Sequence, residues 1–306
     1  MKKKMNKVVA IFGVTILAMS MLVGCGNQAV ETEATENTKT VKENEKENEK
    51  ENKVLEEELT GTVRLAGSTS MEKVANYMKE DFMEKHPGVI VTVEFSGSSA
   101  GVQSLIDGQC DVGDASRGLK DEEIAAGVVQ NNVAFDGITA IVNPANTVTE
   151  ITQEELVKIY TGEITNWNEL GGADGKIVVI GREAGSGTRG AFEELLDVED
   201  VCVLAQELDS NGAVCATVES IEEAIGYASL DIAEAEGGKL NMLTLDGIVP
   251  SVETIKDGSY SLFRPFVMAT YGTMEEQTGV VKAFLEYAFG EEGQAMVKEA
   301  GAIPVN

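Results

Sequence analysis

The feature that most constrains this chain is a repeated unit in which an apolar strand runs into a turn of glycine and hydroxyl residues and then into a helix. The unit occurs three times, with turns at 67–70, 96–101 and 185–188. Strands that alternate with helices predict a parallel sheet in an α/β fold, with ligands beyond the carboxyl ends of the strands. We therefore expect these turns to lie at such ends.

Each turn is a potential anion site without any bulk positive charge. The first N–H groups of the following helix are unpaired, the helix dipole adds partial positive charge, and serine and threonine add hydroxyl donors. The third turn is the richest, because Ser186, Gly187 and Thr188 follow Arg182, whose guanidinium offers a planar fork of donors. One such turn alone is equally consistent with an ordinary connection whose glycines relieve crowding.

Two further patterns concern the strands between these turns. Apolar runs at 128–135 and 138–142 predict two strands separated by Asp136-Gly137. A strand at 261–268 contains Pro265, which predicts an edge or crossover strand, since proline cannot donate to a strand ladder. Two helices are expected near the C-terminus, at 275–289 and 292–300.

The N-terminal segment predicts the compartment. Lysines precede an apolar stretch at 8–23 that is short for a membrane-spanning helix, so we expect a signal peptide over residues 1–25. It ends in Leu22-Val23-Gly24-Cys25, which is similar to a bacterial lipobox, in which the cysteine is lipidated and becomes the mature N-terminus. An ordinary signal peptide with an incidental Cys25 is the alternative. Residues 26–58 are low in complexity and acidic, which predicts a disordered tether.

The net charge excludes nucleic acid as a partner. The whole chain carries −28, residues 1–58 contribute −2, and the body from residue 59 therefore carries −26. Such a field opposes nucleic acid and any diffuse attraction of anions. An anion bound by the body must be held by local, directed donors.

Three enzyme classes are disfavoured by the motifs. The third turn lacks the Gly-Lys-Ser/Thr ending of nucleotide-binding loops, and Ser186 does not stand in a Gly-x-Ser-x-Gly nucleophile motif. The only histidine is His86, and Cys110, Cys202 and Cys215 show no metal-site spacing. We interpret these cysteines as small buried residues, with a Cys202–Cys215 disulfide as the alternative. No catalysis, cofactor or metal is expected.

Four segments in this order resemble one known family. They are Ala66-Gly67-Ser68-Thr69-Ser70, Gly97-Ser98-Ser99-Ala100-Gly101, Asp111 to Arg117 and Gly185-Ser186-Gly187-Thr188, with further matches at 163–167, 226–228 and 260–265. The set resembles the phosphate-binding lipoproteins of bacterial phosphate-specific ABC transporters, over essentially the whole body. The resemblance implies a type II periplasmic-binding-protein fold, with two mixed sheets flanked by helices and two hinge crossings.

The resemblance also implies the organisation and the function of the body. Lobe I comprises residues 59–137 and 262–306, and lobe II comprises residues 138–261. The expected function is to capture inorganic phosphate in the cleft between the lobes and to deliver it to the membrane subunits of an ABC permease. The expected location is outside the cytoplasm, lipid-anchored to a cell membrane of the Gram-positive type. The alternatives are a binding protein for another oxyanion, such as sulfate or molybdate, and a signalling or adhesin lipoprotein that reuses the fold.

The implied ligand set departs from the family pattern at one position. The candidate ligand residues are Ser68, Thr69, Ser70, Ser98, Ser116, Arg117, Asp136, Arg182, Ser186, Gly187 and Thr188. Many members of the family have an aspartate at the position of Ser116, where it accepts the proton of a phosphate P–OH and thereby rejects sulfate. Asp136 is the candidate for that role here, and a hydrogen bond within the hinge is its alternative.

The two candidate arginines, Arg182 and Arg117, are expected to play different parts. Apart from Arg117, Arg182 is the only full positive charge expected in the cleft. For Arg117, the alternative to ligand binding is an ion pair with Asp114 or Asp136 that only holds its loop in shape.

Overall fold

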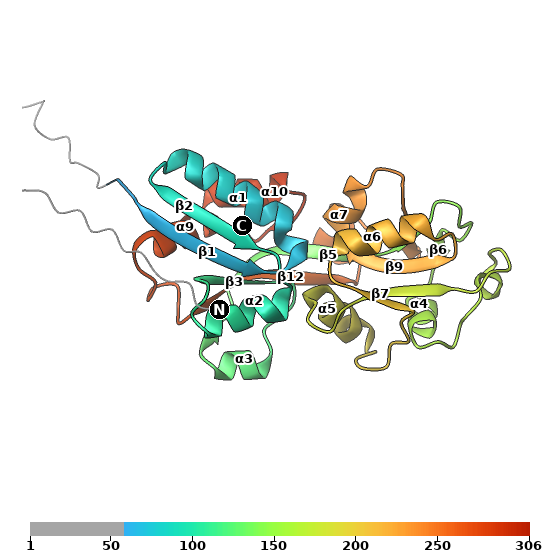
Figure 1. Cartoon of the computed structure of the whole chain (residues 1–306). Helices are drawn as coiled ribbons and strands as arrows, with labels where there is room; N and C mark the ends of the chain where they lie inside the picture. Colours follow the sequence, from blue (N-terminus) through green and yellow to red (C-terminus); the bar gives the residue numbers. More distant parts are fainter. Residues whose placement is uncertain (1–57) are drawn as a thin grey trace, which may run out of the picture. The chain divides into compact units, whose positions relative to one another are not determined.

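The computed structural model describes residues 58–306, which belong to one compact unit (Figure 1). The predicted signal peptide, Cys25 and all but the last residue of the predicted tether lie outside the described residues. None of the helices within 58–306 is long and apolar enough to cross a membrane.

The elements before the first predicted crossing alternate as the sequence suggests. They are β1 (Gly61–Gly67), the 3-10 turn η1 (Thr69–Met71), α1 (Glu72–Lys85), β2 (Val89–Glu94), α2 (Ser98–Ile106), β3 (Val112–Ala115), α3 (Asp121–Ala125) and β4 (Val128–Val129). The strand β5 (Asn132–Val142) follows. The last elements of the chain are β12 (Phe263–Tyr271), α9 (Gly279–Phe289), α10 (Glu291–Glu299) and β13 (Ile303–Pro304).

The elements between β5 and β12 form the second part. They are β6 (Glu150–Ile151), α4 (Gln153–Tyr160), η2 (Trp167–Leu170), β7 (Val178–Arg182), α5 (Gly187–Leu196), β8 (Gln206–Leu208), α6 (Asn211–Ser220), β9 (Ala224–Ser229), α7 (Leu230–Ala235), β10 (Asn241–Met242), β11 (Thr244–Leu245) and α8 (Val252–Lys256). The capping box expected at Thr152 is present and begins α4.

The main strands form one mixed path in the order β2-β1-β3-β12-β5-β9-β7-β8. β1 runs parallel to β2 and β3, and β7 runs parallel to β8 and β9, whereas β12 is antiparallel to both of its neighbours β3 and β5. The first half of β5 pairs with β12 and the second half pairs with β9. The predicted α/β class with mixed pairing is confirmed, and β5 joins its two halves.

Two strand predictions were wrong. β5 runs without a break through Asp136-Gly137. A Cβ on Gly137 would come within 2.5 Å of the end of the Ile255 side chain, which would have to move to make room. β12 is a central strand, not an edge strand, and it tolerates Pro265 because its pairing with β3 begins only at Val267.

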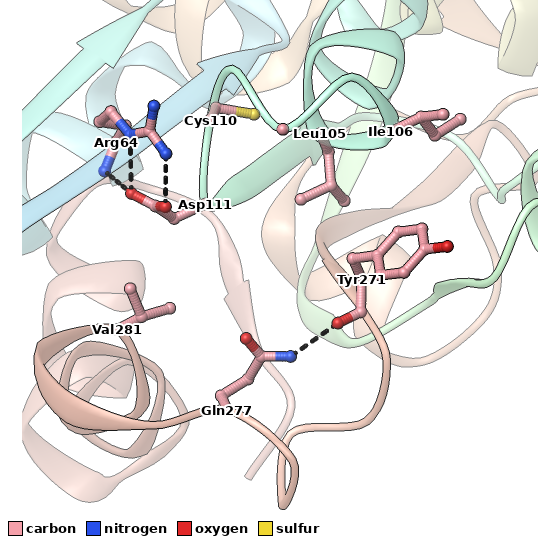
Figure 2. Close-up of a pocket in the computed structure, with 9 residues that line it drawn as sticks. Arg64, Leu105, Ile106, Cys110, Asp111, Tyr271, Gln277 and Val281 are labelled. Carbon is pink, nitrogen blue, oxygen red and sulfur yellow. Dashed lines mark hydrogen bonds and ion pairs between the residues drawn. The ribbon is translucent and has the colours of Figure 1, made fainter.

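A single ion pair ties β1 to the start of β3. Arg64 on β1 donates from Nε and Nη2 to the two carboxylate oxygens of Asp111 at 3.1 and 2.8 Å, as Figure 2 shows. The pair lines a surface pocket with Cys110 and Tyr271, and none of the candidate ligand residues lines that pocket. Arg64 is half exposed, so this pair adds little to stability.

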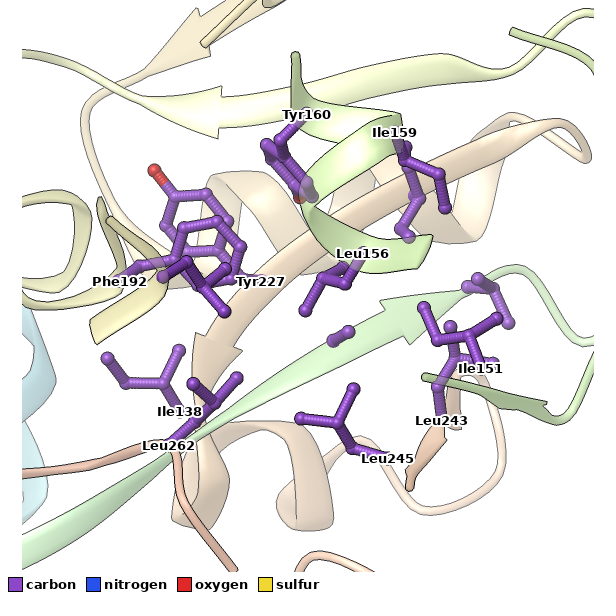
Figure 3. Packing of buried hydrophobic residues seen from close by; sticks show 14 of the residues in the cluster. Ile138, Ile151, Leu156, Ile159, Tyr160, Phe192, Tyr227, Leu243, Leu245 and Leu262 are labelled. Atoms are coloured by element: carbon purple, nitrogen blue, oxygen red, sulfur yellow. The ribbon is translucent and has the colours of Figure 1, made fainter. Parts of the chain in front are cut away.

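Buried apolar side chains form separate clusters around β1–β3 and around β7 and β9. In lobe I, side chains of α1, α9 and α10 pack on one face of β1, β2 and β3, around Met71, Phe82 and Phe284. In lobe II, the ring of Phe192 stacks on Tyr227 with centroids 4.1 Å apart, next to Tyr160 (Figure 3). Leu262 and Ile303 are exceptions, because they lie beyond residue 261 in the chain and pack with the second cluster.

Candidate functional site

All candidate ligand residues are buried, and most of them come from turns after strands, whereas Asp136 lies within β5 and Arg182 ends β7. The turn after β1 provides Ser68, Thr69 and Ser70, the N-terminus of α2 provides Ser98, and the end of β3 leads into Ser116. Ser68 accepts a hydrogen bond from the N–H of Ser70 and so caps η1. These turns follow the carboxyl ends of β1, β2 and β3, as expected for ligand loops in an α/β sheet.

The three turns of lobe I are joined directly through their hydroxyls. Ser68 donates from Oγ to Oγ of Ser116 at 2.7 Å, and the N–H of Ser116 donates to Oγ of Ser98 at 3.1 Å. A dense set of donors is therefore assembled at one place, although the residues lie up to 48 positions apart in the chain.

The turn before α5 meets this group from lobe II. Oγ1 of Thr188 lies 2.8 Å from Oγ of Ser70, and the N–H of Ser99 donates to the carbonyl of Gly185 at 3.1 Å. A Cβ at Gly187 would overlap the Ser98 hydroxyl, so only glycine fits there. Ser186 caps α5 by accepting from the N–H of Arg189.

Arg182 ends β7 and is 1% exposed. Its Nε and Nη2 donate to the carbonyls of Leu208 and Asp209 at 3.0 and 2.7 Å, while its Nη1 is buried without a partner. No carboxylate forms an ion pair with Arg182 among residues 58–306. Burial, together with a smaller effect of the charge of Arg264, lowers the pKa of Arg182 to about 10.

Arg264, on β12, is a second buried cation that the sequence analysis did not assign. It donates from Nη2 to Oγ of Ser70 at 2.9 Å, and from Nη1 to the carbonyl and the hydroxyl of Ser116 at 3.2 and 3.3 Å. The expectation that Arg182 is the only full positive charge here was therefore wrong. The available signal was the matching segment 260–265, which contains Arg264.

Asp136 faces Arg264 across the β5–β12 pair. Its Oδ2 accepts from Nε and Nη2 of Arg264 at 3.2 and 2.9 Å and from the hydroxyl of Ser229 at 2.8 Å. Burial raises the pKa of Asp136, and the charge of Arg264 opposes that rise. One of its two carboxylate oxygens is thus fully used by the protein.

Asp231 shares the hydroxyl of Ser229 with Asp136. Oγ of Ser229 lies 2.6 Å from Oδ1 of Asp231 and 2.8 Å from Oδ2 of Asp136. A serine has one hydrogen to donate, so a proton on Asp231 completes the second contact. Burial and the neighbouring charge of Asp136 raise the pKa of Asp231 to about 7.

The Arg117 side chain stays outside the cluster formed by the hydroxyls of Ser68, Ser70, Ser98 and Ser116. Its guanidinium forms a buried ion pair with Glu123 at 2.7 Å and also donates to Oγ of Ser99. An ion pair with Asp114 or Asp136 was expected as its alternative, and that pairing was wrong. Asp114 is buried without a hydrogen-bond partner, and burial raises its pKa well above its usual range.

The structure adds Asn211, the first residue of α6, to the residues at this place. Its Nδ2 donates to Oγ1 of Thr69 at 3.1 Å and to Oγ of Ser70 at 2.9 Å. Ser210 caps α6, so this is a fourth hydroxyl turn after a strand, and that local pattern was the signal the sequence offered.

The charges at the site do not balance within the protein. Arg182 and Arg264 contribute two buried positive charges, while Asp136 contributes one negative charge when Asp231 holds its proton. Because an uncompensated buried charge is costly, this arrangement fits an anionic ligand with several acceptor oxygens. Within residues 58–306, no cluster of three acidic, histidine or cysteine side chains could hold a metal ion. Cys110, Cys202 and Cys215 are free, so the alternative disulfide is not formed.

Known proteins share both the sequence and the fold of this chain. A family model described as a PBP superfamily domain matches residues 33–292. The phosphate-binding protein PstS of Bacillus subtilis is 33% identical over 254 residues, which cover 82% of this chain and 83% of that protein. PstS of Borreliella burgdorferi is 30% identical, over 79% of this chain and 90% of its own length.

The solved structures agree with these relatives. A putative phosphate ABC transporter substrate-binding protein with bound phosphate from Clostridium perfringens has a TM-score of 0.76 and 37% identity, over 80% of this chain and 100% of that one. An ABC-type phosphate transport receptor from Vibrio cholerae has a TM-score of 0.67 and 32% identity, over the same shares. The chain therefore belongs to the PBP superfamily and, within it, to the PstS-type phosphate-binding proteins.

Proposed function

We propose that this chain is an extracytoplasmic substrate-binding protein that captures inorganic phosphate between its two lobes and delivers it to an ABC permease. The observation that carries the proposal is the buried Nη1 of Arg182, which has no hydrogen-bond partner within residues 58–306. A phosphate oxygen would supply that partner and would also offset the excess positive charge of the two arginines. The printed names of the relatives support the same ligand.

The proposed ligand shell draws on both lobes. Lobe I contributes the hydroxyl side chains of Thr69, Ser70, Ser98 and Ser116, and lobe II contributes Arg182 and the N-terminus of α5 with Ser186, Gly187 and Thr188. Ser68 supports this shell by donating to Ser116. Because a ligand held by both lobes stabilises their contact, binding would produce the closed surface that a permease recognises.

The mechanism involves no reaction of the ligand. Phosphate exchanges its water shell for directed hydrogen bonds and leaves unchanged, so we propose no catalytic residue. Arg117 would hold its loop through Glu123 and would not contact phosphate. We further propose that Cys25 carries a lipid anchor and that residues 26–58 act as a tether at the outer face of the membrane.

The test is calorimetric titration of the purified chain with phosphate, with and without excess sulfate. Micromolar or tighter binding that sulfate does not displace is the expected result. Displacement by sulfate or molybdate would favour a binding protein for another oxyanion. Absence of binding to any of these anions would overturn the transport role and favour a signalling or adhesin lipoprotein.

Discrimination against sulfate has its own test at Asp136. Because Oδ2 is occupied by Arg264 and Ser229, we propose that Asp136 mainly holds Arg264, with acceptance of the P–OH proton left to its other oxygen. Asp136→Asn keeps the shape and removes the charge. A loss of preference for phosphate over sulfate supports the acceptor role, and an unchanged preference removes Asp136 from it.

A further inference from the structure

Asn211 joins the two lobes beside the site and is not part of the ligand shell proposed above. Its side chain is fully buried at the start of α6 in lobe II. Its Nδ2 donates to the hydroxyls of Thr69 and Ser70 in lobe I, and its Oδ1 accepts from the backbone N–H of Ser229 at 3.2 Å. All the hydrogen-bonding groups of this amide therefore face partners that also border the site.

The orientation of the amide follows from the chemistry of its neighbours. A backbone N–H can only donate, so the atom that faces Ser229 must be the amide oxygen of Asn211. The NH2 group is thereby turned to the two hydroxyls, and each of its hydrogens has one acceptor. The hydroxyl oxygens of Thr69 and Ser70 must therefore each accept a hydrogen bond from Asn211.

Arg264 completes the assignment of hydrogens at Ser70. A guanidinium also only donates, and its Nη2 lies 2.9 Å from Oγ of Ser70. The oxygen of Ser70 therefore accepts from both Asn211 and Arg264, which occupies its two lone pairs. Its single hydrogen is left for the third neighbour, Oγ1 of Thr188 at 2.8 Å. The hydrogen of Thr188 then remains free for another acceptor.

We propose that Asn211 is a positioning residue that, together with Arg264, forces the hydroxyl of Ser70 to donate to Thr188 and thereby leaves the hydroxyl of Thr188 to donate toward a bound oxyanion. The inference rests on the proposed function. With only one imposed donor, the Ser70 hydroxyl can rotate and accept from Thr188 instead, and Thr188 then turns a lone pair toward the anion that repels a ligand oxygen. Asn211 therefore favours a ligand that presents proton-free oxygens on this side of the site.

The test compares two variants of the full chain by phosphate titration at pH 5 and pH 8. Asn211→Leu removes both donors at similar volume and is expected to weaken binding about tenfold at either pH, since one or more buried partners lose their hydrogen bonds. Asn211→Asp keeps the shape but cannot donate when ionised. Its affinity relative to the wild-type chain is expected to recover severalfold from pH 8 to pH 5, because burial raises the pKa of this carboxyl and the protonated acid donates one hydrogen again.

The recovery with pH separates orientation of hydroxyls from simple packing. A purely structural role for Asn211 predicts the same relative affinity for Asn211→Asp at both pH values, and that result would overturn the inference. If Asn211→Leu fails to fold, the pH profile of Asn211→Asp decides alone. Asn168→Asp, which adds one negative charge to an exposed position of lobe II, is the matched control and is expected to bind like the wild-type chain.

The outcomes also separate this inference from the proposed function. If the wild-type chain binds phosphate and both Asn211 variants bind it with the same affinity as the wild-type chain, only the role of Asn211 is overturned. Failure of the wild-type chain to bind phosphate overturns the proposed function, and the inference falls with it.

Discussion

The two arginines buried at the site, one in each lobe, are stabilised in different ways. Arg264 in lobe I is paired with the carboxylate of Asp136 at 2.9 Å. Arg182 in lobe II is held by two backbone carbonyls, and its Nη1 has no partner. Arg264 has its own counter-ion and arranges the hydroxyls of Ser70 and Ser116, whereas the charge of Arg182 is left for a ligand.

The difference follows from how a buried charge is compensated. A carboxylate offsets the desolvation of a guanidinium most fully, whereas carbonyl dipoles offset it only in part. A binding protein that must release its ligand needs one charge that is incompletely satisfied without it. Loss of the counter-ion of Arg264 should therefore lower mainly the stability of the chain, and loss of Arg182 should lower mainly its affinity for phosphate.

The largest effect is expected from removing the counter-ion of Arg264. Asp136→Ala leaves a fully buried guanidinium uncompensated, and breaking a buried pair in this way costs about 3–5 kcal/mol of unfolding free energy. Denaturant unfolding without phosphate measures this loss. Asp111→Ala, which breaks the half-exposed pair with Arg64, is the matched control and should cost at most about 1 kcal/mol. Equal losses in the two variants would contradict the importance of Asp136.

Arg182 should show the reverse pattern. Arg182→Met removes the charge at similar length, and phosphate affinity is expected to fall about 10- to 100-fold, since charge-assisted hydrogen bonds are worth about 1.5–3 kcal/mol. The unfolding free energy without phosphate should change less than in Asp136→Ala, because no carboxylate loses its partner. Calorimetry and unfolding of the same sample check both parts. A variant that loses stability but keeps its affinity would reverse the roles of the two arginines.

The turns of the site could be predicted from the sequence because their signal is local. Hydroxyl residues and glycines between a strand and a helix identify Ser68, Ser98 and Ser186 wherever the strands lie in the sheet. Arg182 could be predicted for the same reason, since it ends the strand before such a turn.

Arg264 and Arg117 required the tertiary structure. Arg264 meets Asp136 across 128 residues, and Pro265 beside it suggested an edge strand. Arg117 was predicted to bind the ligand because it follows Ser116, but it forms an ion pair with Glu123 of α3 instead. The path of the strand and the partners that the fold brings near decide which of two adjacent polar residues faces a ligand. The local sequence shows neither of them.

The pH dependence of stability should reveal the proton held beside Asp136. The pKa of Asp231 is raised from 3.8 to about 7, so its protonated form is favoured in the folded chain. Its contribution is fully present below about pH 4 and is lost as the pH rises through 7, at up to about 1.4 kcal/mol per pH unit. Thermal unfolding between pH 5 and 8 is expected to show falling stability.

Asp231→Asn should flatten this slope. The raised pKa values of Asp136 and Asp114 act in the same direction, so some slope remains in the variant. Arg117 donates to the Glu123 carboxylate and so lowers its pKa. The stability that this ion pair contributes is therefore lost only at more acidic pH. An Asp231→Asn variant with the slope of the wild-type chain would place the proton elsewhere.

The smallest effect is expected from a single neutral hydroxyl. Ser98→Ala removes one donor to the ligand and the acceptor for the N–H of Ser116, and a neutral hydrogen bond is worth about 1 kcal/mol, or about fivefold in affinity. Ser104→Ala, on the same helix α2 and outside the site, is the matched control and should bind like the wild-type chain. If Ser98→Ala lost more affinity than Arg182→Met in the same titration, the ligand would be held mainly by the hydroxyl turns, and the uncompensated charge of Arg182 would not be its main anchor.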